Sequence, residues 1–177
     1  MSDQQAMRDL LDKQAITEVI YNYSRACDRL DRELLESVYW PDGTDDHGIF
    51  KGTAPEYFEW VMGLLGAWRS SHHDNTNILI RLEGDVAYGE CHWVGYYSFE
   101  VDGVLHDQLA AGRYLDRFEK RGGEWRIKHR TSVSEWNRLE PAQGDWRAKR
   151  GPEMPPSRRD RTDPSYDIEN IAIISAE

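Results

Sequence analysis

The sequence has little cysteine, no long apolar run and few basic residues for its acidic ones. Its 177 residues include 2 Cys, Cys27 and Cys91, which are too few for a disulfide framework and fit small apolar fillers in the reduced state. No stretch approaches the roughly 18 apolar residues of a membrane-spanning helix, and the N-terminal "MSDQQAMRDLL" has no hydrophobic signal core. We therefore expect a cytoplasmic protein with no membrane partner.

The shortage of basic residues argues against nucleic acid as a partner. The net charge is −10, whereas a phosphate-binding surface needs clustered Lys and Arg. The Arg-rich run "DWRAKRGPEMPPSRRDRTD" is interleaved with acids and prolines, which is typical of a solvated tail. We therefore predict one domain over residues 1–139 and an irregular Pro/Arg/Asp-rich tail over 140–177 that contains a short apolar end, "IAIIS".

Aromatic residues, by contrast, are plentiful in so polar a chain. The sequence holds 7 Trp and 9 Tyr. Two interpretations stay open at this point: the rings line a cavity for a flat, apolar ligand, or they replace aliphatic residues in an ordinary core.

The order of the predicted elements indicates an α+β fold. Apolar residues recur at helical spacing over 7–27, Asp31 is a candidate N-cap for a second helix, and "PDGTDDHG" reads as a turn. A brief strand over 48–51 precedes a third helix that Thr53 caps. Four long strand candidates then follow, separated by the turns "EGD", "DG" and "GG", which favour antiparallel hairpins. Three helices on a curved antiparallel sheet make a cone that encloses a pocket.

Several segments carry a family resemblance: "DKQAITEVIYNYSRACDRLD", "HHDNTNILI", "GRYLDRFEKRGGEWRIKHR" and "SEW". Over residues 7–138 the chain resembles the SnoaL-like branch of the nuclear transport factor 2-like superfamily. The resemblance implies a cone-shaped α+β barrel. It does not fix a reaction, because this fold hosts dehydratases, dehydrohalogenases, isomerases, cyclases, lyases and non-enzymes.

The resemblance also implies a set of catalytic residues. Dehydratases and the dehydrochlorinase of the superfamily use a helix-borne aspartate and a histidine as a dyad, and Asp28 and His73 stand at the matching places. Tyr23 matches a tyrosine of the dehydratase-type members, and Arg130 matches an arginine beside the dehydrochlorinase dyad. The chain departs from the pattern at two places. Gly95 falls near a second aspartate of the bile-acid dehydratase, and Tyr97 replaces the second histidine of scytalone dehydratase.

The Asp28–His73 pair makes chemical sense as a base. A carboxylate that accepts a hydrogen bond from one imidazole nitrogen fixes the tautomer, so the other nitrogen can take a proton from substrate. Considered alone, Asp28 is also compatible with a helix-terminal aspartate and His73 with an ordinary surface or core histidine. The motif favours His73 over His72, which we expect to point elsewhere.

The chain offers several candidate metal ligands: His72, His73, Asp74, His92 and His106. No spacing such as H-x-x-x-H gathers them on one face, and a catalytic zinc needs about three protein ligands. The chain also has no phosphate loop or nucleotide motif, so we expect neither a metal nor another cofactor.

Side-chain alternation in the strands predicts which residues line the pocket. The family pattern sends Trp93 and Tyr97 inward, with Tyr97 as a hydroxyl donor, and Trp68 and Leu64 of the third helix cap the cone or simply pack in the core. Two arguments disagree about the direction of the Arg130 side chain. Strict alternation in "EWRIKHRTSV" puts it opposite the apolar face, whereas the resemblance puts it inside. We expect it inside.

The leading functional hypothesis is a cofactor-independent lyase or dehydratase that acts on an aromatic or polycyclic small molecule. His73 is the base and Asp28 its orienter, and the eliminated group is water, halide or formaldehyde, possible substrates including a lignin-derived diaryl diol. Two alternatives stay open: an isomerase or polyketide-cyclase-like enzyme, and a non-catalytic small subunit of a ring-hydroxylating oxygenase. The outward positions of one strand are rather apolar: Leu109, Ala111, Arg113 and Leu115. We therefore expect a homotrimer through this face, with a dimer as second choice.

Overall fold

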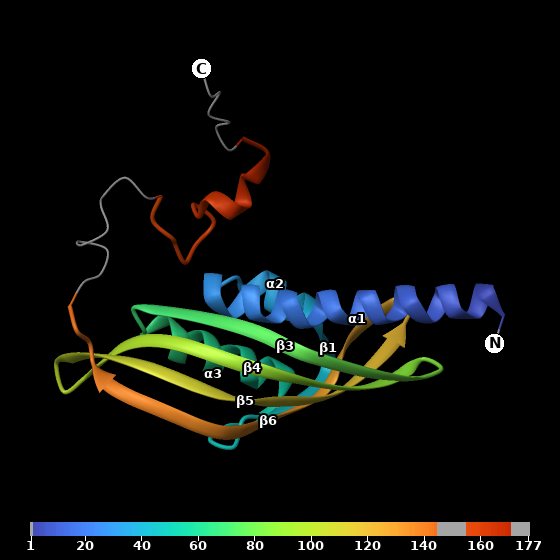
Figure 1. The fold of residues 1–177 in the computed structure, drawn as a ribbon, viewed down its shortest axis with the longest axis horizontal. Coiled ribbons are helices and arrows are strands. Elements are labelled where there is room, and N and C mark those ends of the chain that lie inside the picture. Colours follow the sequence, from blue (N-terminus) through green and yellow to red (C-terminus); the bar gives the residue numbers. More distant parts are fainter. Residues whose placement is uncertain (1, 145–154, 171–177) are drawn as a thin grey trace.

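The computed structural model describes residues 2–144 and 155–170, in which three helices pack against one six-stranded sheet (Figure 1). In chain order the elements are α1 (Asp3–Arg29), α2 (Arg32–Val38), β1 (Tyr39–Asp46), β2 (Lys51–Thr53), α3 (Ala54–Gly66), β3 (Ser70–Glu83), β4 (Val86–Val101), β5 (Val104–Arg121) and β6 (Glu124–Pro141). The predicted α+β class, with helices on a curved sheet, is confirmed. Among the described helices, none is long and apolar enough to cross a membrane.

The ends of α1 and α2 are set by local capping interactions. Ser2 accepts a hydrogen bond from the backbone N–H of Gln5 at 3.3 Å and starts α1. Leu30 adopts the left-handed conformation at φ 52° and ends it. Asp31 then accepts from the backbone N–H of Leu34 at 3.1 Å, so it is the N-cap that the sequence predicts for α2.

The start of α3 is also as predicted. The Glu56 carboxylate accepts hydrogen bonds from the Thr53 backbone N–H at 2.8 Å and from its hydroxyl at 2.7 Å, which closes a capping box. Pro55 occupies the first turn, where the missing N–H has no partner to lose.

The sheet has the strand order β2-β1-β6-β5-β4-β3. β1 runs parallel to β6, and the other neighbours are antiparallel. β2 and β3 form its two edges, so the sheet is curved but does not close into a barrel. The prediction of a turn at "PDGTDDHG" was wrong, because residues 39–46 form β1 and pair with β6. The Pro-Asp-Gly run is absorbed by a register shift between Tyr39 and Thr44. The brief strand predicted at 48–51 lies at Lys51–Thr53.

A β-bulge resolves the conflict over Arg130. On β6, Lys128 is an extra residue between Ile127 and His129, which are paired with adjacent positions of β5. Beyond a bulge the alternation of side chains is reversed, so Ile127 and Arg130 are both buried although three positions separate them. Strict alternation therefore fails at this strand for a physical reason.

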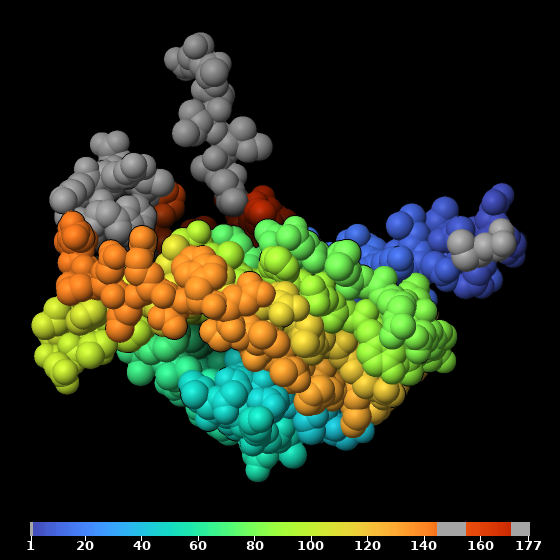
Figure 2. Space-filling model, turned by 60° about the horizontal axis from the view of Figure 1, so that its bottom comes forward, coloured from blue at the N-terminus to red at the C-terminus, as the bar shows by residue number. Residues whose placement is uncertain are grey.

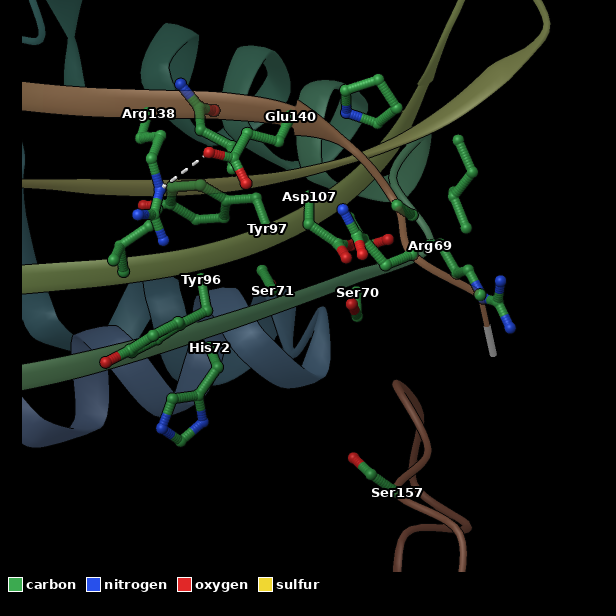
Figure 3. Close-up of a pocket in the computed structure, with 18 of the residues that line it drawn as sticks. Arg69, Ser70, Ser71, His72, Tyr96, Tyr97, Asp107, Arg138, Glu140 and Ser157 are labelled. Carbon is green, nitrogen blue, oxygen red and sulfur yellow. Dashed lines mark ion pairs between the residues drawn. The ribbon is translucent and has the colours of Figure 1, made fainter. Parts of the chain in front are cut away.

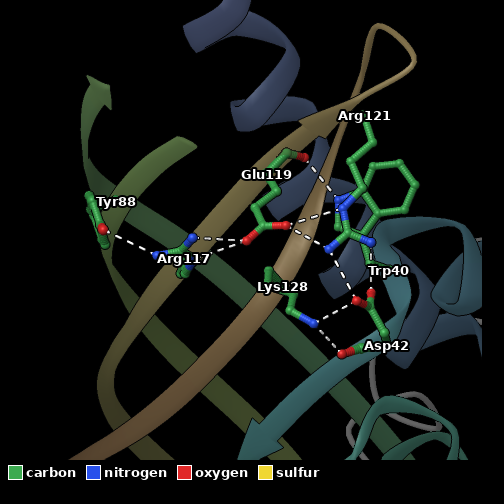
Figure 4. A network of polar contacts seen from close by, with 7 residues as sticks. All are labelled: Trp40, Asp42, Tyr88, Arg117, Glu119, Arg121 and Lys128. Carbon is green, nitrogen blue, oxygen red and sulfur yellow. Dashed lines mark hydrogen bonds and ion pairs between the residues drawn. The ribbon is translucent and has the colours of Figure 1, made fainter. Parts of the chain in front are cut away.

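An exposed polar network holds β1 against β5 and β6 (Figure 4). Asp42 of β1 pairs with Arg121 at 2.8 Å and with the bulged Lys128 at 2.8 Å. Hydrogen bonds from these two cations hold the pKa of Asp42 well below its usual range. Glu119 accepts from Arg117 and Arg121, all three on β5. Because the network is at the surface, salt screens it and its contribution to stability is small.

The core lies between the helices and the inner face of the sheet. The largest fully buried side chains are Arg130, Tyr23, Tyr39, Tyr57, Phe118, Ile16, Ile20, Leu35 and Ile127. The N-terminal half of α1 projects past this core (Figure 2), and its residues Met7, Leu10 and Leu11 are each more than half exposed.

Residues 155–170 of the C-terminal segment lie against the α1–α2 corner, with two short 3-10 turns at Pro164–Tyr166 and Ile168–Asn170 (Figure 1). Asp163 pairs with Arg29 at 3.4 Å, and the Tyr166 hydroxyl donates to Asp31 at 2.7 Å. The predicted apolar end "IAIIS" lies outside the described residues.

Candidate functional site

The last turn of α1 and the first residues of β3 bring Asp28 and His73 into contact. His73 Nδ1 lies 2.7 Å from Asp28 Oδ1, and the backbone N–H of His73 donates to Asp28 Oδ2 at 2.9 Å. The two side chains are only 9% and 7% exposed. Two-point attachment in a shielded place fixes the orientation of the carboxylate and of the ring.

The electrostatics of this dyad define which nitrogen is the base. Burial opposes ionisation of Asp28, but hydrogen bonds and charge from His73 outweigh burial and lower the pKa of Asp28 below its ordinary value. The ionised carboxylate takes a proton-bearing Nδ1 as its partner, so in the neutral ring Nε2 carries the lone pair.

Tyr97 of β4 faces that nitrogen. Its hydroxyl lies 3.0 Å from His73 Nε2, with the two rings edge to face at 5.3 Å. Burial raises the pKa of the Tyr97 phenol, which therefore stays protonated and able to donate at neutral pH. Gly95 makes this approach possible, because a Cβ at that position would lie 2.0 Å from the Tyr97 oxygen.

The two residues predicted to cap the cone are placed differently. Trp68 packs against Tyr97 at 4.9 Å and stacks on Phe99 at 5.0 Å, so it adjoins the dyad through Tyr97. Leu64 is half-buried, whereas its neighbour Leu65 is buried in the core.

Trp93 lies on the inner face of β4 and stacks on Tyr114 of β5 at 5.8 Å. Gly112 provides the space, because a Cβ there would lie 2.8 Å from the Trp93 ring. The indole Nε1 of Trp93 is buried and has no hydrogen-bond partner among the described residues.

Tyr23 and Arg130 form a cluster next to the dyad rather than part of it. Arg130 is fully buried, makes a two-point ion pair with Asp116 at 2.7 Å for each contact, and lies 4.1 and 4.0 Å from the ring centroids of Tyr23 and Tyr114. The Tyr23 hydroxyl lies 2.5 Å from that of Tyr57. Neither Tyr23 nor Arg130 hydrogen-bonds to the dyad in the described part of the chain.

Sequence reasoning missed a second Asp–His pair. His47 Nδ1 is hydrogen-bonded to Asp45 Oδ1, and Asp45 Oδ2 accepts from the Tyr39 hydroxyl at 2.7 Å. Asp45 and His47 both lie in the segment "PDGTDDHG" that was predicted to be a turn. The available signal was the D-x-H spacing, which places two side chains on one face only if the segment is a strand.

The metal candidates are dispersed. His72 is exposed and pairs with Asp74 at 3.1 Å, and His106 contacts the backbone carbonyl of Val104. Within residues 2–144 and 155–170, no group of three or more His, Cys, Asp or Glu could hold a metal ion.

A pocket of about 760 Å³ opens at one end of the sheet (Figure 3). His72, Tyr96, Leu109 and Arg138 form a paired row across four strands of its wall. Because His72 and His73 are adjacent on β3, this row points to the opposite face of the sheet from His73. Tyr97 also borders the pocket but the dyad residues do not, so the pocket lies beside the dyad and is not centred on it.

Comparison with known proteins identifies the family. Residues 8–131 match the SnoaL-like domain family, and the chain belongs to it. A sequence relative, an uncharacterized protein of Mycobacterium tuberculosis, is 25% identical over 132 residues, which cover 72% of this chain and 88% of the relative.

Solved structures share the fold at low sequence identity. A scytalone dehydratase-like protein from Novosphingobium aromaticivorans has a TM-score of 0.67 and 21% identity, with 76% of this chain and 91% of that chain covered. A hexachlorocyclohexane dehydrochlorinase from Novosphingobium barchaimii has a TM-score of 0.66 and 20% identity, with 79% and 96% covered. At this level of identity these neighbours establish the three-helix, curved-sheet fold for this chain.

Proposed function

We propose that the protein is a cofactor-independent lyase in which His73 removes a proton from a small aromatic substrate. The observation that carries the proposal is the buried Asp28–His73 hydrogen bond at 2.7 Å, which orients an imidazole whose Nε2 is met by a protonated phenol at 3.0 Å. Such a base contributes roughly 10²–10⁴-fold to a proton-transfer step.

Each residue near the dyad has a role in this scheme. Asp28 orients the His73 ring and stabilises the imidazolium that forms when Nε2 accepts the proton. Tyr97 donates to Nε2 in the ligand-free protein, and a substrate that displaces its hydroxyl receives that hydrogen bond on an oxygen atom. Arg130 and Tyr23 supply a positive charge and a hydroxyl further inside.

The rings around the dyad favour an aromatic substrate. Trp68 and Tyr97 contact each other beside His73, and Trp93 and Tyr114 stack deeper on the inner face. Flat apolar faces with a few polar groups suit a phenolic or polycyclic molecule that loses water, halide or formaldehyde. A lignin-derived diaryl diol is one substrate of this kind.

The test uses dialysed, chelator-treated protein and a panel of β-hydroxy aryl ketones and diaryl diols, with products identified by mass. Turnover should persist after chelation and fall by about 10²-fold or more in His73→Ala and Asp28→Asn, because both changes remove the oriented base. His106→Ala is the matched control and should keep wild-type activity, since the His106 ring contacts the backbone carbonyl of Val104 and borders neither the pocket nor the dyad.

The same experiment separates the alternatives. Product of unchanged mass would identify an isomerase or cyclase, which uses the same base without a leaving group. Full activity in both dyad variants would refute the assignment. A protein without turnover that purifies with a larger metal-containing chain would support the accessory-subunit alternative.

A further inference from the structure

The second Asp–His pair, Asp45 and His47, lies next to Tyr23 of α1. Asp45 is fully buried at the end of β1, and its carboxylate accepts hydrogen bonds from His47 Nδ1 and, at 2.7 Å, from the Tyr39 hydroxyl. The His47 side chain is 17% exposed, so it can exchange protons with solvent although its partner cannot.

Tyr23 and Tyr57 extend this pair into the interior. His47 Nε2 lies 3.5 Å from the Tyr23 hydroxyl, which is 2.5 Å from the Tyr57 hydroxyl. The His47 ring stacks on Tyr57 at 5.0 Å. Burial raises the pKa of both phenols well above the ordinary value, so each keeps its proton and can pass one along the chain.

The second Asp–His pair adjoins the dyad through α1. Cys27 lies between Tyr23 and Asp28 on the buried side of this helix. Burial, together with the charge of Asp28 and against a hydrogen bond with Tyr23, raises the pKa of the Cys27 thiol to about 12. The neutral Cys27 thiol therefore contacts Tyr23 and also interacts electrostatically with Asp28 of the dyad.

Two buried donors point to an oxygen-bearing ligand at this place. Arg130 Nη1 and Trp93 Nε1 are buried without a hydrogen-bond partner among the described residues. Both side chains lie against the Tyr114 ring, at 4.0 and 5.8 Å, and Tyr114 lies 6.0 Å from His47. An unsatisfied buried donor is costly, and a ligand oxygen would satisfy it.

We infer that Asp45, His47 and Tyr23 form a second acid–base unit, which returns a proton to the leaving group while His73 removes one from carbon. The inference rests on the proposed elimination. A purely structural polar network would satisfy Asp45 equally well with Tyr39 and a non-titrating amide. Such a network would not require a partly exposed imidazole next to the hydroxyl of Tyr23, a residue on the same helix as Asp28.

The proposed step balances. The C–H bond breaks, its proton passes to His73 Nε2, and its electron pair forms the new double bond. The C–O bond breaks, and the departing oxygen takes the Tyr23 proton to become water. His47 starts protonated beside the Asp45 carboxylate and restores the Tyr23 proton from Nε2. The two histidines then exchange one proton each with solvent.

Several titratable or charged groups surround His47 and set the background for its protonation. They are Asp45 and Tyr39 from β1, Tyr23 from α1, Tyr57 from α3, Tyr114 from β5, and the Arg130–Asp116 pair behind Tyr23 and Tyr114. Among these groups only the His47 side chain is partly exposed, and the others are buried.

The decisive experiment compares two leaving groups in His47→Gln. A β-hydroxy aryl ketone needs a proton on the departing oxygen, whereas the matched β-chloro ketone releases chloride without one. We expect kcat for the hydroxy ketone to fall about 10²-fold or more in His47→Gln, with little change for the chloro ketone. The alkaline limb of the pH profile for the hydroxy ketone should disappear in the same variant. Tyr23→Phe, which removes only a hydroxyl, should show the same selectivity.

The controls separate this inference from the proposed function. His73→Ala should lose both reactions, and His129→Gln should lose neither, because His129 bonds Thr44 and Thr131 on the opposite face. Equal loss of both reactions in His47→Gln, or an unchanged alkaline limb, would overturn the second unit while the first stands.

A second measurement does not depend on turnover. If the wild type eliminates neither group, the proposed function fails, and phenol binding followed by NMR still tests the site. Phenol should shift the ring signals of both His73 and His47, as identified with the His73→Ala and His47→Gln proteins. A shift confined to His73 would overturn the inference.

Discussion

At the scale of single residues, the position of the Tyr97 hydroxyl depends on the missing side chain of Gly95. A Cβ at Gly95 would lie 2.0 Å from that oxygen, so Gly95→Ala must push the phenol away from His73. We expect kcat/KM to fall by about 10-fold or more, close to the effect of Tyr97→Phe, because each change removes the same hydroxyl from Nε2.

A double-mutant cycle checks this coupling. In Gly95→Ala/Tyr97→Phe the two losses should not add, since the second change removes a group that the first has already displaced. Additive losses would show that Gly95 acts through the backbone of β4 rather than through Tyr97. Circular dichroism should match the wild type in all three variants.

Sequence reasoning reached the dyad only through the resemblance. Asp28 and His73 are 45 positions apart, and no periodicity relates a helix end to a strand start. The resemblance placed them at matching positions, and the structure puts them in hydrogen-bond contact; their catalytic role stays a prediction. Asp45 and His47 were missed because a segment that combines Pro, Gly and several Asp favours a turn when only neighbouring residues are considered.

At the scale of elements, Arg159 of the C-terminal segment connects the three elements that surround the dyad. Its guanidinium donates to the backbone carbonyls of Leu65 at 2.7 Å, Trp68 at 2.8 Å and Asp28 at 3.3 Å, and to Ser71 Oγ at 3.0 Å. It therefore satisfies carbonyls at the C-terminal ends of α1 and α3, where a cation is favourable.

Arg159→Ala should lower the free energy of unfolding by about 2 kcal/mol, because a half-buried charged donor to several carbonyls is lost. Activity should fall with it, since Asp28 and the start of β3 lose a common anchor. Arg161→Ala is the matched control, because the Arg161 side chain is 63% exposed and pairs with Asp31 and with the exposed Glu33 rather than with helix-end carbonyls. Urea unfolding measures both, and equal stability of the two variants would contradict the anchoring role.

The elements themselves were predictable where local signals suffice. Helical periodicity and the caps Asp31 and Thr53 placed the helices, and the turns placed the long hairpins. β1 was not predictable, because its stability comes from parallel pairing with β6, more than 80 residues away. The bulge at Lys128 is likewise visible only in the register between two strands.

At the scale of the whole molecule, apolar surface remains exposed on two features that a single chain leaves uncovered. Leu115 and Trp136 are 37% and 48% exposed on the outer face of the sheet, and Leu10 and Leu11 are exposed on the projecting part of α1 (Figure 2). Arg113 on the same outer face forms ion pairs with Glu90 and Glu135 of its own chain. Association would therefore be driven by the apolar side chains.

We expect a homotrimer through the outer face, with a dimer as the second choice, because apolar side chains on this face stay exposed in a single chain. A stable interface of this kind buries about 800 Å² from each partner. Light scattering at micromolar concentration should give a mass near three times the 20.6 kDa of one chain. Leu115→Asp should dissociate the assembly without loss of secondary structure, because it buries a charge at the contact. Ile49→Asp is the control, since Ile49 is an exposed apolar residue of the β1–β2 turn and does not belong to the outer-face strands β5 and β6. A wild-type mass of one chain would exclude the trimer and the dimer together.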